Sequence, residues 1–324
     1  VVACSAAVSA CAAGGHWALA LRLVRGMQQR GPPPNVVTYG AAISACERAG
    51  QAEQARAWLK EMWLRSLVPS TIAYNAAISA CEKSRCWEEA LLLLEEMRRE
   101  RLEPDLVSCN AAISACEKGK RWEQAMRLLD AAQQLGLEPE GVTFNAVTSA
   151  CEKGLWWPAA LGVLREVRRR GSPASLVGCN AAISACAKGG CWAWALHLLR
   201  EMQAAGLEPN MVTFSAVVTS ACEEGGALAQ ALGLLAQMQR RGLRPDAIAY
   251  AAAIRACGAA RLWAEALRLL GEMSADGMTP DALSYGVAVG ACEGLDRQLD
   301  ALALLEGAAA SATRAWLQPA DRMR

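Results

Sequence analysis

One nine-residue segment recurs along the chain at a fixed interval, and this interval restricts the possible folds more than any other feature. The segment Asn-Ala-Ala-Ile-Ser-Ala-Cys-Glu-Lys occupies residues 75–83 and 110–118, and near-copies occupy residues 145–153 and 180–188. Successive copies begin 35 residues apart. A period of about 20 to 50 residues is typical of stacked-repeat proteins, in which each repeat packs only on its neighbours. The sequence therefore predicts a repeat array that needs no central core.

The period divides the chain into eight full repeats and a partial ninth. Numbered from the N-terminus, the repeats begin at Val1, Val36, Thr71, Leu106, Gly141, Leu176, Met211, Ala247 and Ala282. Seven of the full repeats have 35 residues, and repeat 7 has 36. Residues 1–306 are predicted to form the array, and residues 307–324 an irregular C-terminal tail. The first residue is Val and not Met, so we expect a fragment and infer nothing about a targeting segment.

Each repeat carries the patterns of two helices separated by a break. In repeat 3, Tyr74, Ile78 and Cys81 recur at helical spacing and predict the buried face of a first helix, whereas Asn75 and Lys83 lie on a polar stripe beside it. Glycines mark the break in several repeats. The second helix ends before a proline near the end of the repeat, as at residues 102–105.

Tryptophan recurs at the start of the second helix. It occupies this place at Trp17, Trp87, Trp122, Trp157, Trp192 and Trp263. A surface for stacking bases is one interpretation, and a large apolar plug between helices is the one we favour. Glycines at 136, 206 and 242 are expected to end second helices as C-cap residues.

These patterns predict an all-α fold, because no strand pattern occurs. Two such helices cannot bury a sufficient core alone, so we expect stacked repeats to form a right-handed α-solenoid superhelix. The first helix would then line one concave surface throughout, and its polar stripe would be repeated along that surface. This stripe is the candidate functional region.

Composition excludes several classes of protein. No apolar run approaches the roughly 18 residues that a membrane span needs, and a net charge of +1 gives no general attraction to polyanions. Nine of the 14 cysteines occupy one place in the repeat, namely Cys11, Cys46, Cys81, Cys116, Cys151, Cys186, Cys222, Cys257 and Cys292. Equivalent helices of stacked repeats are too far apart for disulfide geometry. We therefore expect free, buried thiols in a reducing compartment.

No catalytic constellation is visible. The two histidines, His16 and His197, lie in second-helix regions without a repeated acid or cysteine partner. The cysteines lack the clustered spacing of metal ligands, and no phosphate-binding loop occurs. We expect no enzymatic activity, metal ion or other cofactor within this stretch.

Four features together resemble the pentatricopeptide repeat family: the period, the Tyr-Asn start of the first helix, the Ala-Leu-x-Leu-Leu-x-x-Met centre of the second helix, and the Gly-Leu-x-Pro-Asp end of the repeat. The resemblance covers residues 1 to about 306. The uniform repeat length resembles the pure-repeat class of the family. This resemblance implies a sequence-specific single-stranded RNA-binding protein of organellar RNA metabolism (processing, stabilisation or translation), located in a chloroplast or mitochondrion.

The family reads one base per repeat with two side chains, which by resemblance are the fifth and the last residue of each repeat. The pairs in repeats 1 to 8 are Ser5 with Asn35, Gly40 with Ser70, Asn75 with Asp105, Asn110 with Glu140, Asn145 with Ser175, Asn180 with Asn210, Ser215 with Asp246, and Ala251 with Asp281. On the family's code, repeats 1, 3, 6 and 7 imply adenine, uracil, cytosine and guanine, and repeat 5 implies a pyrimidine. The pairs of repeats 2, 4 and 8 depart from the strong combinations of the code. Written in the order of the repeats, the implied footprint is A-N-U-Y-Y-C-G-R, in which N is any base, Y a pyrimidine and R a purine.

The second residue of each repeat is aliphatic. The set is Val2, Val37, Ile72, Val107, Val142, Val177, Val212, Ile248 and Leu283. By resemblance, these side chains sandwich successive bases. Ordinary packing against the adjacent first helix is the alternative, and the sequence leaves both open.

Cations recur near the end of the first helix in five consecutive repeats. They are Arg48, Lys83, Lys118, Lys153 and Lys188. Regular phosphate contacts would need such a series, and the preference of a helix C-terminus for Lys or Arg is the alternative explanation. Glutamates at 47, 82, 117 and 152 precede four of them and would partly offset the positive charge.

The expected partner is single-stranded RNA, with other RNA-processing proteins as further partners; we expect a monomer that does not bind membranes. A competing function is that of an α-solenoid scaffold for protein–protein interaction, which would bind peptides. RNA binding through several phosphates should weaken steeply with added salt, whereas apolar peptide binding should not.

Overall fold

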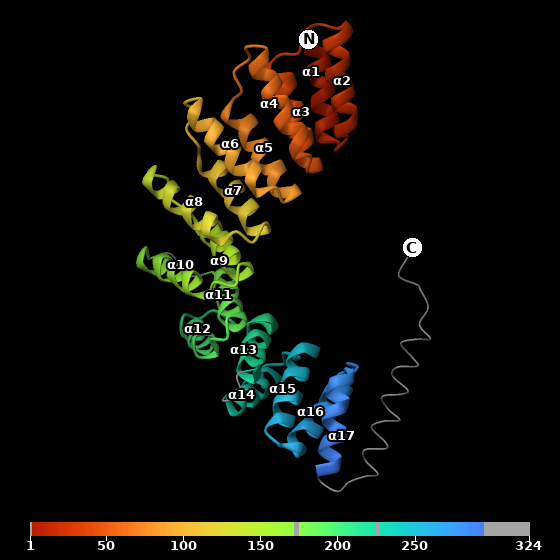
Figure 1. Ribbon diagram of the computed structural model, residues 1–324, viewed down its shortest axis with the longest axis vertical. Helices are drawn as coiled ribbons and strands as arrows, with labels where there is room; N and C mark the ends of the chain where they lie inside the picture. The colour runs from red at the N-terminus through yellow and green to blue at the C-terminus, as the bar shows by residue number, and fades with distance from the viewer. Residues whose placement is uncertain (1, 172–174, 224–226, 295–324) are drawn as a thin grey trace, which may run out of the picture. The chain divides into compact units, whose positions relative to one another are not determined.

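The computed structural model describes residues 2–171, 175–223 and 227–294, and these residues are all-helical (Figure 1). Repeats 1 to 8 each contribute a first and a second α-helix, and the described part of repeat 9 contributes a first helix. The first helices are α1 (Val2–Ala13), α3 (Val36–Ala49), α5 (Thr71–Ser84), α7 (Leu106–Lys118), α9 (Gly141–Lys153), α11 (Leu176–Lys188), α13 (Met211–Glu223), α15 (Ala247–Ala259) and α17 (Ala282–Gly294). The second helices are α2 (Trp17–Arg30), α4 (Ala52–Leu64), α6 (Trp87–Arg99), α8 (Trp122–Gln134), α10 (Trp157–Arg169), α12 (Trp192–Ala204), α14 (Leu228–Arg240) and α16 (Trp263–Ala275).

The helix boundaries follow the sequence period closely. From repeat 2 onward, every first helix begins at the first residue of its repeat. The predicted all-α solenoid of helix-turn-helix repeats is therefore confirmed. The predicted tail, residues 307–324, lies outside the described residues, and the handedness of the superhelix stays a prediction.

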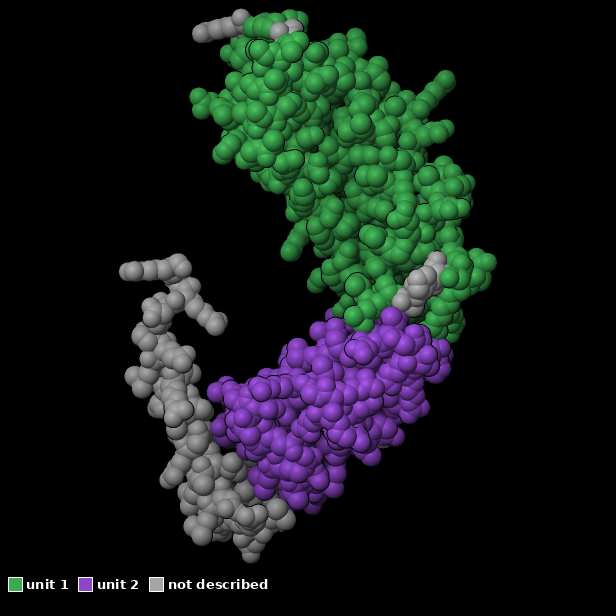
Figure 2. All heavy atoms as spheres, turned by 180° about the vertical axis from the view of Figure 1, so that it is seen from behind, with its two compact units in different colours: residues 1–178 green, residues 179–324 purple. Residues whose placement is uncertain are grey.

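The chain divides into two compact units, Val1–Gly178 and Cys179–Arg324 (Figure 2). The first compact unit contains repeats 1 to 5, and the described parts of repeats 7 to 9 belong to the second. Each compact unit has the same two-layer construction. In the first compact unit, consecutive first helices from α1 to α9 pack on one another, and second helices pack on the first helix of their own repeat and of the next, as α4 does on α3 and α5. In the second unit, α13, α15 and α17 pack in the same way, and α14 and α16 pack on the first helices beside them.

The first helices bury mostly small side chains. In α5 the buried residues are Ala73, Tyr74, Ala76, Ala77, Ile78, Ala80 and Cys81. Interaxial distance depends on the side chains at the contact, so Ala and Cys allow neighbouring helices to approach closely. The Tyr-Ile-Cys face predicted from the sequence is buried, whereas on the predicted polar stripe Lys83 is exposed and Asn75 is half-buried.

The cysteines that the structure describes are thiols outside any disulfide. Burial raises the pKa of Cys81 to about 12 and that of Cys116 to about 11. At neutral pH these groups are protonated, and each behaves as a small apolar side chain. The expectation of buried thiols therefore holds at the repeated position from Cys46 to Cys257, whereas Cys11 is half-buried and the side chain of Cys292 lies outside the described part of the chain.

Tryptophans at the start of the second helices pack against the following repeat. A Cβ atom added at Gly119 would lie 2.5 Å from Cδ1 of Trp87, and one added at Gly154 would lie 2.4 Å from Cδ1 of Trp122. The guanidinium carbon of Arg121 lies 4.6 Å from the centroid of the Trp87 ring. These contacts support the plug interpretation over a base-stacking surface.

Glycine serves two different purposes at the ends of helices. Gly136, Gly206 and Gly242 have φ angles of 73°, 75° and 71°, the left-handed conformation expected of a residue that ends a helix. After α7, however, Lys120 and not Gly119 has a positive φ. Gly119 is needed for space beside Trp87, so its role is packing between repeats.

Among the described helices, none has both the length and the apolar character that crossing a membrane would require.

We predict that Gly119→Ala destabilises the protein by about 1–3 kcal/mol, because the added methyl group overlaps Trp87. Gly162→Ala is the matched control, since Gly162 lies inside α10 with no atom within 4 Å of an added Cβ. That change should stabilise the protein by up to about 1 kcal/mol through helix propensity. Urea denaturation followed by circular dichroism measures both, and equal effects of the two variants would contradict the packing role.

Candidate functional site

The aliphatic second residues are exposed in every repeat. Their exposed fraction ranges from 55% at Val212 to 85% at Val2. The full set is Val2, Val37, Ile72, Val107, Val142, Val177, Val212, Ile248 and Leu283. Packing against an adjacent helix would have buried them. The first helices therefore present one exposed aliphatic side chain per repeat, a regular pattern that isolated surface residues do not show.

The fifth and last residues of repeat 3 meet, although 30 residues separate them in the sequence. Asn75 Nδ2 donates to both carboxylate oxygens of Asp105 at 3.1 Å. Asp105 is the N-cap of α7, and its Oδ1 accepts a hydrogen bond from the backbone amide of Ser108 at 2.8 Å. Asp105 therefore caps one helix and contacts the amide of the preceding one.

Hydrogen bonding keeps the Asp105 carboxylate ionised. Burial opposes ionisation, but hydrogen bonds from the amide and hydroxyl of Ser108 and from Asn75 outweigh it and lower the pKa of Asp105. The carboxylate is consequently an acceptor only. Beside the Asn75 amide, it forms a polar pair with defined donors and acceptors.

The third residue of the following repeat completes this network. Ser108 Oγ donates to Asn75 Oδ1. Thr143 Oγ1 donates to Asn110 Oδ1 at 2.7 Å, and Thr213 Oγ1 donates to Asn180 Oδ1 at 2.6 Å. Because each hydroxyl donates to the amide oxygen, the Nδ2 group of each Asn is directed away from it.

Repeat 1 uses the same three places with different groups. Ser5 Oγ and Thr38 Oγ1 are 2.8 Å apart, and Thr38 Oγ1 donates to Asn35 Oδ1 at 2.8 Å. Asn35 is also the N-cap of α3. The predicted pair of Ser5 and Asn35 is therefore bridged by the third residue of repeat 2.

These third residues were not predicted from the sequence. The structure buries the third residues Thr38, Ser108, Thr143 and Thr213. A capping-box pattern, with an N-cap residue followed three places later by a polar residue, was the signal that identifies them. Asn35 with Thr38 and Asp105 with Ser108 form such boxes in the structure.

In repeat 5 the fifth and last residues are hydrogen-bonded directly, without a hydroxyl group from the third residue of the next repeat. Ser175 Oγ donates to Asn145 Oδ1 at 2.5 Å, and the third residue of repeat 6 is Gly178. A Cβ atom at Gly178 would lie 2.7 Å from Asn145 Oδ1. Glycine at this place therefore makes room for the direct pairing of Asn145 with Ser175.

In the remaining predicted pairs, the two side chains are not hydrogen-bonded to each other. Glu140 makes no side-chain cap of α9, so its longer carboxylate does not take the place that Asp105 occupies. Ser70 and Asp246 cap α5 and α15. Ser215 Oγ is buried without a hydrogen-bond partner, because the third residue of repeat 8 is Ala249.

The cations near the ends of the first helices pair with glutamates of the preceding repeat. Lys118 Nζ lies 2.9 Å from Glu82, and Lys153 Nζ lies 2.7 Å from Glu117. The same carboxylates accept hydrogen bonds from serines, as Glu117 does from Ser149 at 2.7 Å. These contacts join neighbouring first helices and neutralise much of the charge expected from the sequence.

The other two cations of the first compact unit have weaker or different partners. Lys83 Nζ lies 3.7 Å from Glu47, and Arg48 donates to the backbone carbonyl of Ala13 at 2.9 Å. The predicted cationic series therefore exists on the surface, but these members are engaged between repeats.

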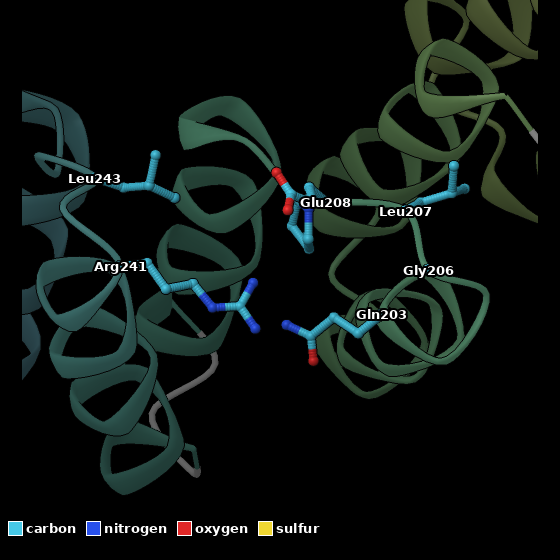
Figure 3. A pocket seen from close by; sticks show the side chains of 7 residues that line it. Gln203, Gly206, Leu207, Glu208, Arg241 and Leu243 are labelled. Carbon is cyan, nitrogen blue, oxygen red and sulfur yellow. The ribbon is translucent and has the colours of Figure 1, made fainter.

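A polar hollow of about 530 Å³ lies near the ends of α12 and α14. Figure 3 shows Arg241 and Gln203 extending toward one another across it. The Arg241 guanidinium carbon also lies 5.7 Å from the centroid of the Phe214 ring. None of the predicted base-reading residues lines this hollow, so it is separate from the candidate site.

Three family models match the chain. The model described as "PPR repeat family" matches residues 69–118 and 174–223, "Pentatricopeptide repeat domain" matches 4–84 and 233–294, and "PPR repeat" matches 107–137 and 142–172. Together these matches cover most of the chain. The chain belongs to the pentatricopeptide repeat family.

Solved pentatricopeptide repeat structures share the fold. The crystal structure of the pentatricopeptide repeat protein PPR10 from maize is 27% identical with a TM-score of 0.71, over 95% of this chain and 44% of PPR10. PPR10 in complex with an 18-nt psaJ RNA element is 24% identical with a TM-score of 0.68, over 89% of this chain and 42% of PPR10. The chain thus spans less than half the length of PPR10.

A more distant likeness exists to the PPR domain of Arabidopsis thaliana protein-only RNase P 1 in complex with tRNA. It is 13% identical with a TM-score of 0.51, over 56% of this chain and 95% of that domain. A comparison with curated protein sequences gives no match.

We predict that Ser108→Ala destabilises this pentatricopeptide repeat array by about 1–3 kcal/mol, since it leaves the oxygen of Asn75 without its buried donor. Ser79→Ala is the control, because Ser79 bonds to Glu47 on the more exposed stripe and should cost under about 1 kcal/mol. Thermal denaturation of both variants measures the difference. A smaller effect for Ser108→Ala than for Ser79→Ala would contradict the assigned network.

Proposed function

We propose that this protein binds single-stranded RNA along the surface formed by its first helices, with one base per repeat. The observation that carries the proposal is the exposure of the aliphatic second residues, each on the same helix as the amide or hydroxyl of a fifth residue in most repeats. Splayed bases lose their mutual stacking, and apolar side chains at regular intervals replace it. PPR10, a relative in fold and sequence, is bound to an 18-nt psaJ RNA element in one of its structures.

The polar pairs, present in six of the eight full repeats, supply the means of selection. In repeat 3, the Asn75 amide and the Asp105 carboxylate together offer donors and acceptors to the Watson–Crick edge of a base. The hydroxyl of Ser108 fixes which end of the amide faces the base. Uracil is the base that the family's code assigns to this pair, and the proposed footprint remains A-N-U-Y-Y-C-G-R from 5′ to 3′.

The ion pairs of Lys118 and Lys153 affect how strongly RNA phosphates would bind to these two cations. Lys118 and Lys153 are held by Glu82 and Glu117, so a phosphate must compete with a carboxylate for each ammonium group. We infer that base contacts contribute a larger share of affinity than a free cationic series would allow. Binding should still weaken with added salt, because each phosphate contact releases counterions.

The proposed role is binding without catalysis, with processing, stabilisation or translation of an organellar transcript as its consequence. The described residues contain no group of three or more potential metal ligands. Fluorescence anisotropy with labelled RNA, competed by ribohomopolymers and a scrambled sequence, tests the proposal. Equal affinity for every sequence would overturn the base-reading part, and salt-independent peptide binding without RNA binding would favour the scaffold alternative.

We predict that Asn75→Ser changes the preferred third base from uracil to guanine, since it gives repeat 3 the combination present in repeat 7, Ser215 with Asp246. The preference should shift by about tenfold, the order expected for one well-placed hydrogen-bonded pair. Binding to RNAs that differ only at the third base measures the shift. Asn75→Ala is the control and should lose the uracil preference without acquiring one for guanine; an unchanged uracil preference in either variant would contradict the assignment.

We predict that Glu82→Gln combined with Glu117→Gln tightens RNA binding several-fold, because it frees Lys118 and Lys153 and removes two negative charges near the phosphates. The salt dependence should also steepen, by about one unit of slope for each ammonium group that then binds a phosphate. Equilibrium binding measured at salt concentrations from about 50 to about 200 mM gives both the affinity and the slope.

The matched control removes two carboxylates from a second helix. Glu88 and Glu95 are exposed on α6, and their change to Gln should leave both affinity and slope within about twofold of the parent. Equal tightening by both pairs of substitutions would show a general charge effect and contradict the proposed competition.

A further inference from the structure

Repeat 8 differs from most of the other repeats at two places on its first helix, α15. Its fifth residue is Ala251, which has no polar group, and its ninth residue is Arg255. Serine holds the ninth place in repeats 1 to 6, at Ser9, Ser44, Ser79, Ser114, Ser149 and Ser184. The usual base-reading group is therefore absent, and a guanidinium is present four residues further along the same helical face.

A pocket of about 240 Å³ lies where the missing side chain would be. Ile248, Ala251 and Arg255 of α15 line it, together with Met273 of α16 and Asp281, which precedes α17. Helices α15, α16 and α17 pack on one another within the second compact unit. The volume is below the range of about 300–1,000 Å³ typical of sites for larger ligands, so a single planar base suits it better.

The guanidinium of Arg255 is available. Its side chain is partly buried, and it makes no hydrogen bond or ion pair with any residue that the structure describes. Hydrogen bonding by Ser284 and, to a smaller extent, the charge of Arg255 lower the pKa of Asp281, so the guanidinium lies near that carboxylate. Asp281 accepts from the backbone amide of Ser284 through Oδ1 at 2.7 Å, which leaves its second oxygen uncommitted in this contact. The pocket is thus lined by the N–H donors of the Arg255 guanidinium and by the Asp281 carboxylate.

Ser284 provides an independent sign that the repeat is incomplete. It is the third residue of repeat 9 and the counterpart of Ser108, which donates to Asn75. Ser284 is 0% exposed, and its Oγ makes no hydrogen bond of standard geometry, although the side chain lies close enough to Asp281 to lower the pKa of that carboxyl group. Ala251 supplies no acceptor, so the hydroxyl that orients an amide in repeat 3 has nothing to orient in repeat 8.

We propose that repeat 8 binds guanine, with Arg255 donating to O6 and N7 and Asp281 accepting from the N1 and N2 hydrogens. Ile248 and Leu283, 66% and 65% exposed, flank this place and would sandwich the base. This inference rests on the proposed RNA-binding function and replaces the general purine assignment of the eighth base.

The chemistry of guanine fits the two groups at once. Its O6 and N7 atoms are neighbouring acceptors that match the bidentate fork of arginine. Its N1–H and N2–H groups are neighbouring donors that match a carboxylate. Adenine places an amino group where O6 lies and an acceptor where N1–H lies, so Arg255 would face a donor and Asp281 an acceptor.

The test uses the purified chain and labelled RNAs of the sequence A-C-U-C-C-C-G-X, with X as guanine, adenine, inosine or 7-deazaguanine. Guanine should bind about 5- to 100-fold tighter than adenine, the discrimination of one or two good bidentate contacts. Inosine lacks the N2 amino group and 7-deazaguanine lacks N7, so each should lose part of that preference. Equal binding of all four would overturn the proposal.

Three variants distinguish the effect of the bidentate geometry of the Arg255 guanidinium from the effect of its charge. Arg255→Ser restores the usual ninth residue and should lower the guanine preference at least about fivefold, leaving only the share that Asp281 supplies. Arg255→Lys keeps the charge but not the fork, and should retain overall affinity while losing most of the preference. Arg200→Ser removes an exposed arginine of α12 and should leave the preference unchanged.

The outcomes distinguish this inference from the proposed function. Selective binding at the bases of repeats 3, 6 and 7 without guanine preference at X would overturn the role of Arg255 alone. Absence of RNA binding would overturn the proposed function. A guanine preference that is undiminished in Arg255→Ser, in a variant whose thermal transition matches the parent, would also overturn the assignment.

Discussion

Close packing between consecutive first helices is the contact on which the rest of the structure depends. Small buried residues such as Ala77, Ala80 and Cys81 form the contacting faces. They bring each first helix near enough for the N-cap of the next to contact the fifth residue of the previous one. Larger side chains on these faces would separate the helices and would part Asn75 from Asp105.

The polar pairs of the candidate site consequently serve two purposes. Asp105 caps α7 and contacts Asn75, and Ser108 both completes the capping box and orients the Asn75 amide. Groups held in this way lose little further freedom when a ligand binds, which reduces the entropic cost of recognition. Selectivity and helix capping therefore depend on the same atoms, and a substitution in one repeat affects both.

Charged side chains also form contacts between the first helices of neighbouring repeats. Glu82 accepts from Ser114 and pairs with Lys118, and Glu117 does the same with Ser149 and Lys153. Such partly exposed pairs contribute little individually, about 1 kcal/mol or less. Their regular recurrence nevertheless gives neighbouring first helices a defined register and leaves the face near neutral.

Much of the fold was predictable from the sequence because the interactions that define it are local or periodic. The 35-residue interval, the apolar stripe of Tyr74, Ile78 and Cys81, and the prolines and glycines between helices specify the elements without reference to distant residues. The fifth and last residues were predicted as pairs through family resemblance, and the structure brings Asn75 and Asp105 together.

Other features depended on which residues become neighbours in space. The pairing of Lys118 with Glu82 spans 36 residues and could not be inferred from the Glu-Lys doublet within one repeat. The role of Gly119 follows from Trp87 in the preceding repeat, and the availability of Arg255 follows from the absence of a partner among the residues that the structure describes. Periodic sequence thus specifies helices and their repetition, whereas packing decides which polar groups are already satisfied and which remain open to a ligand.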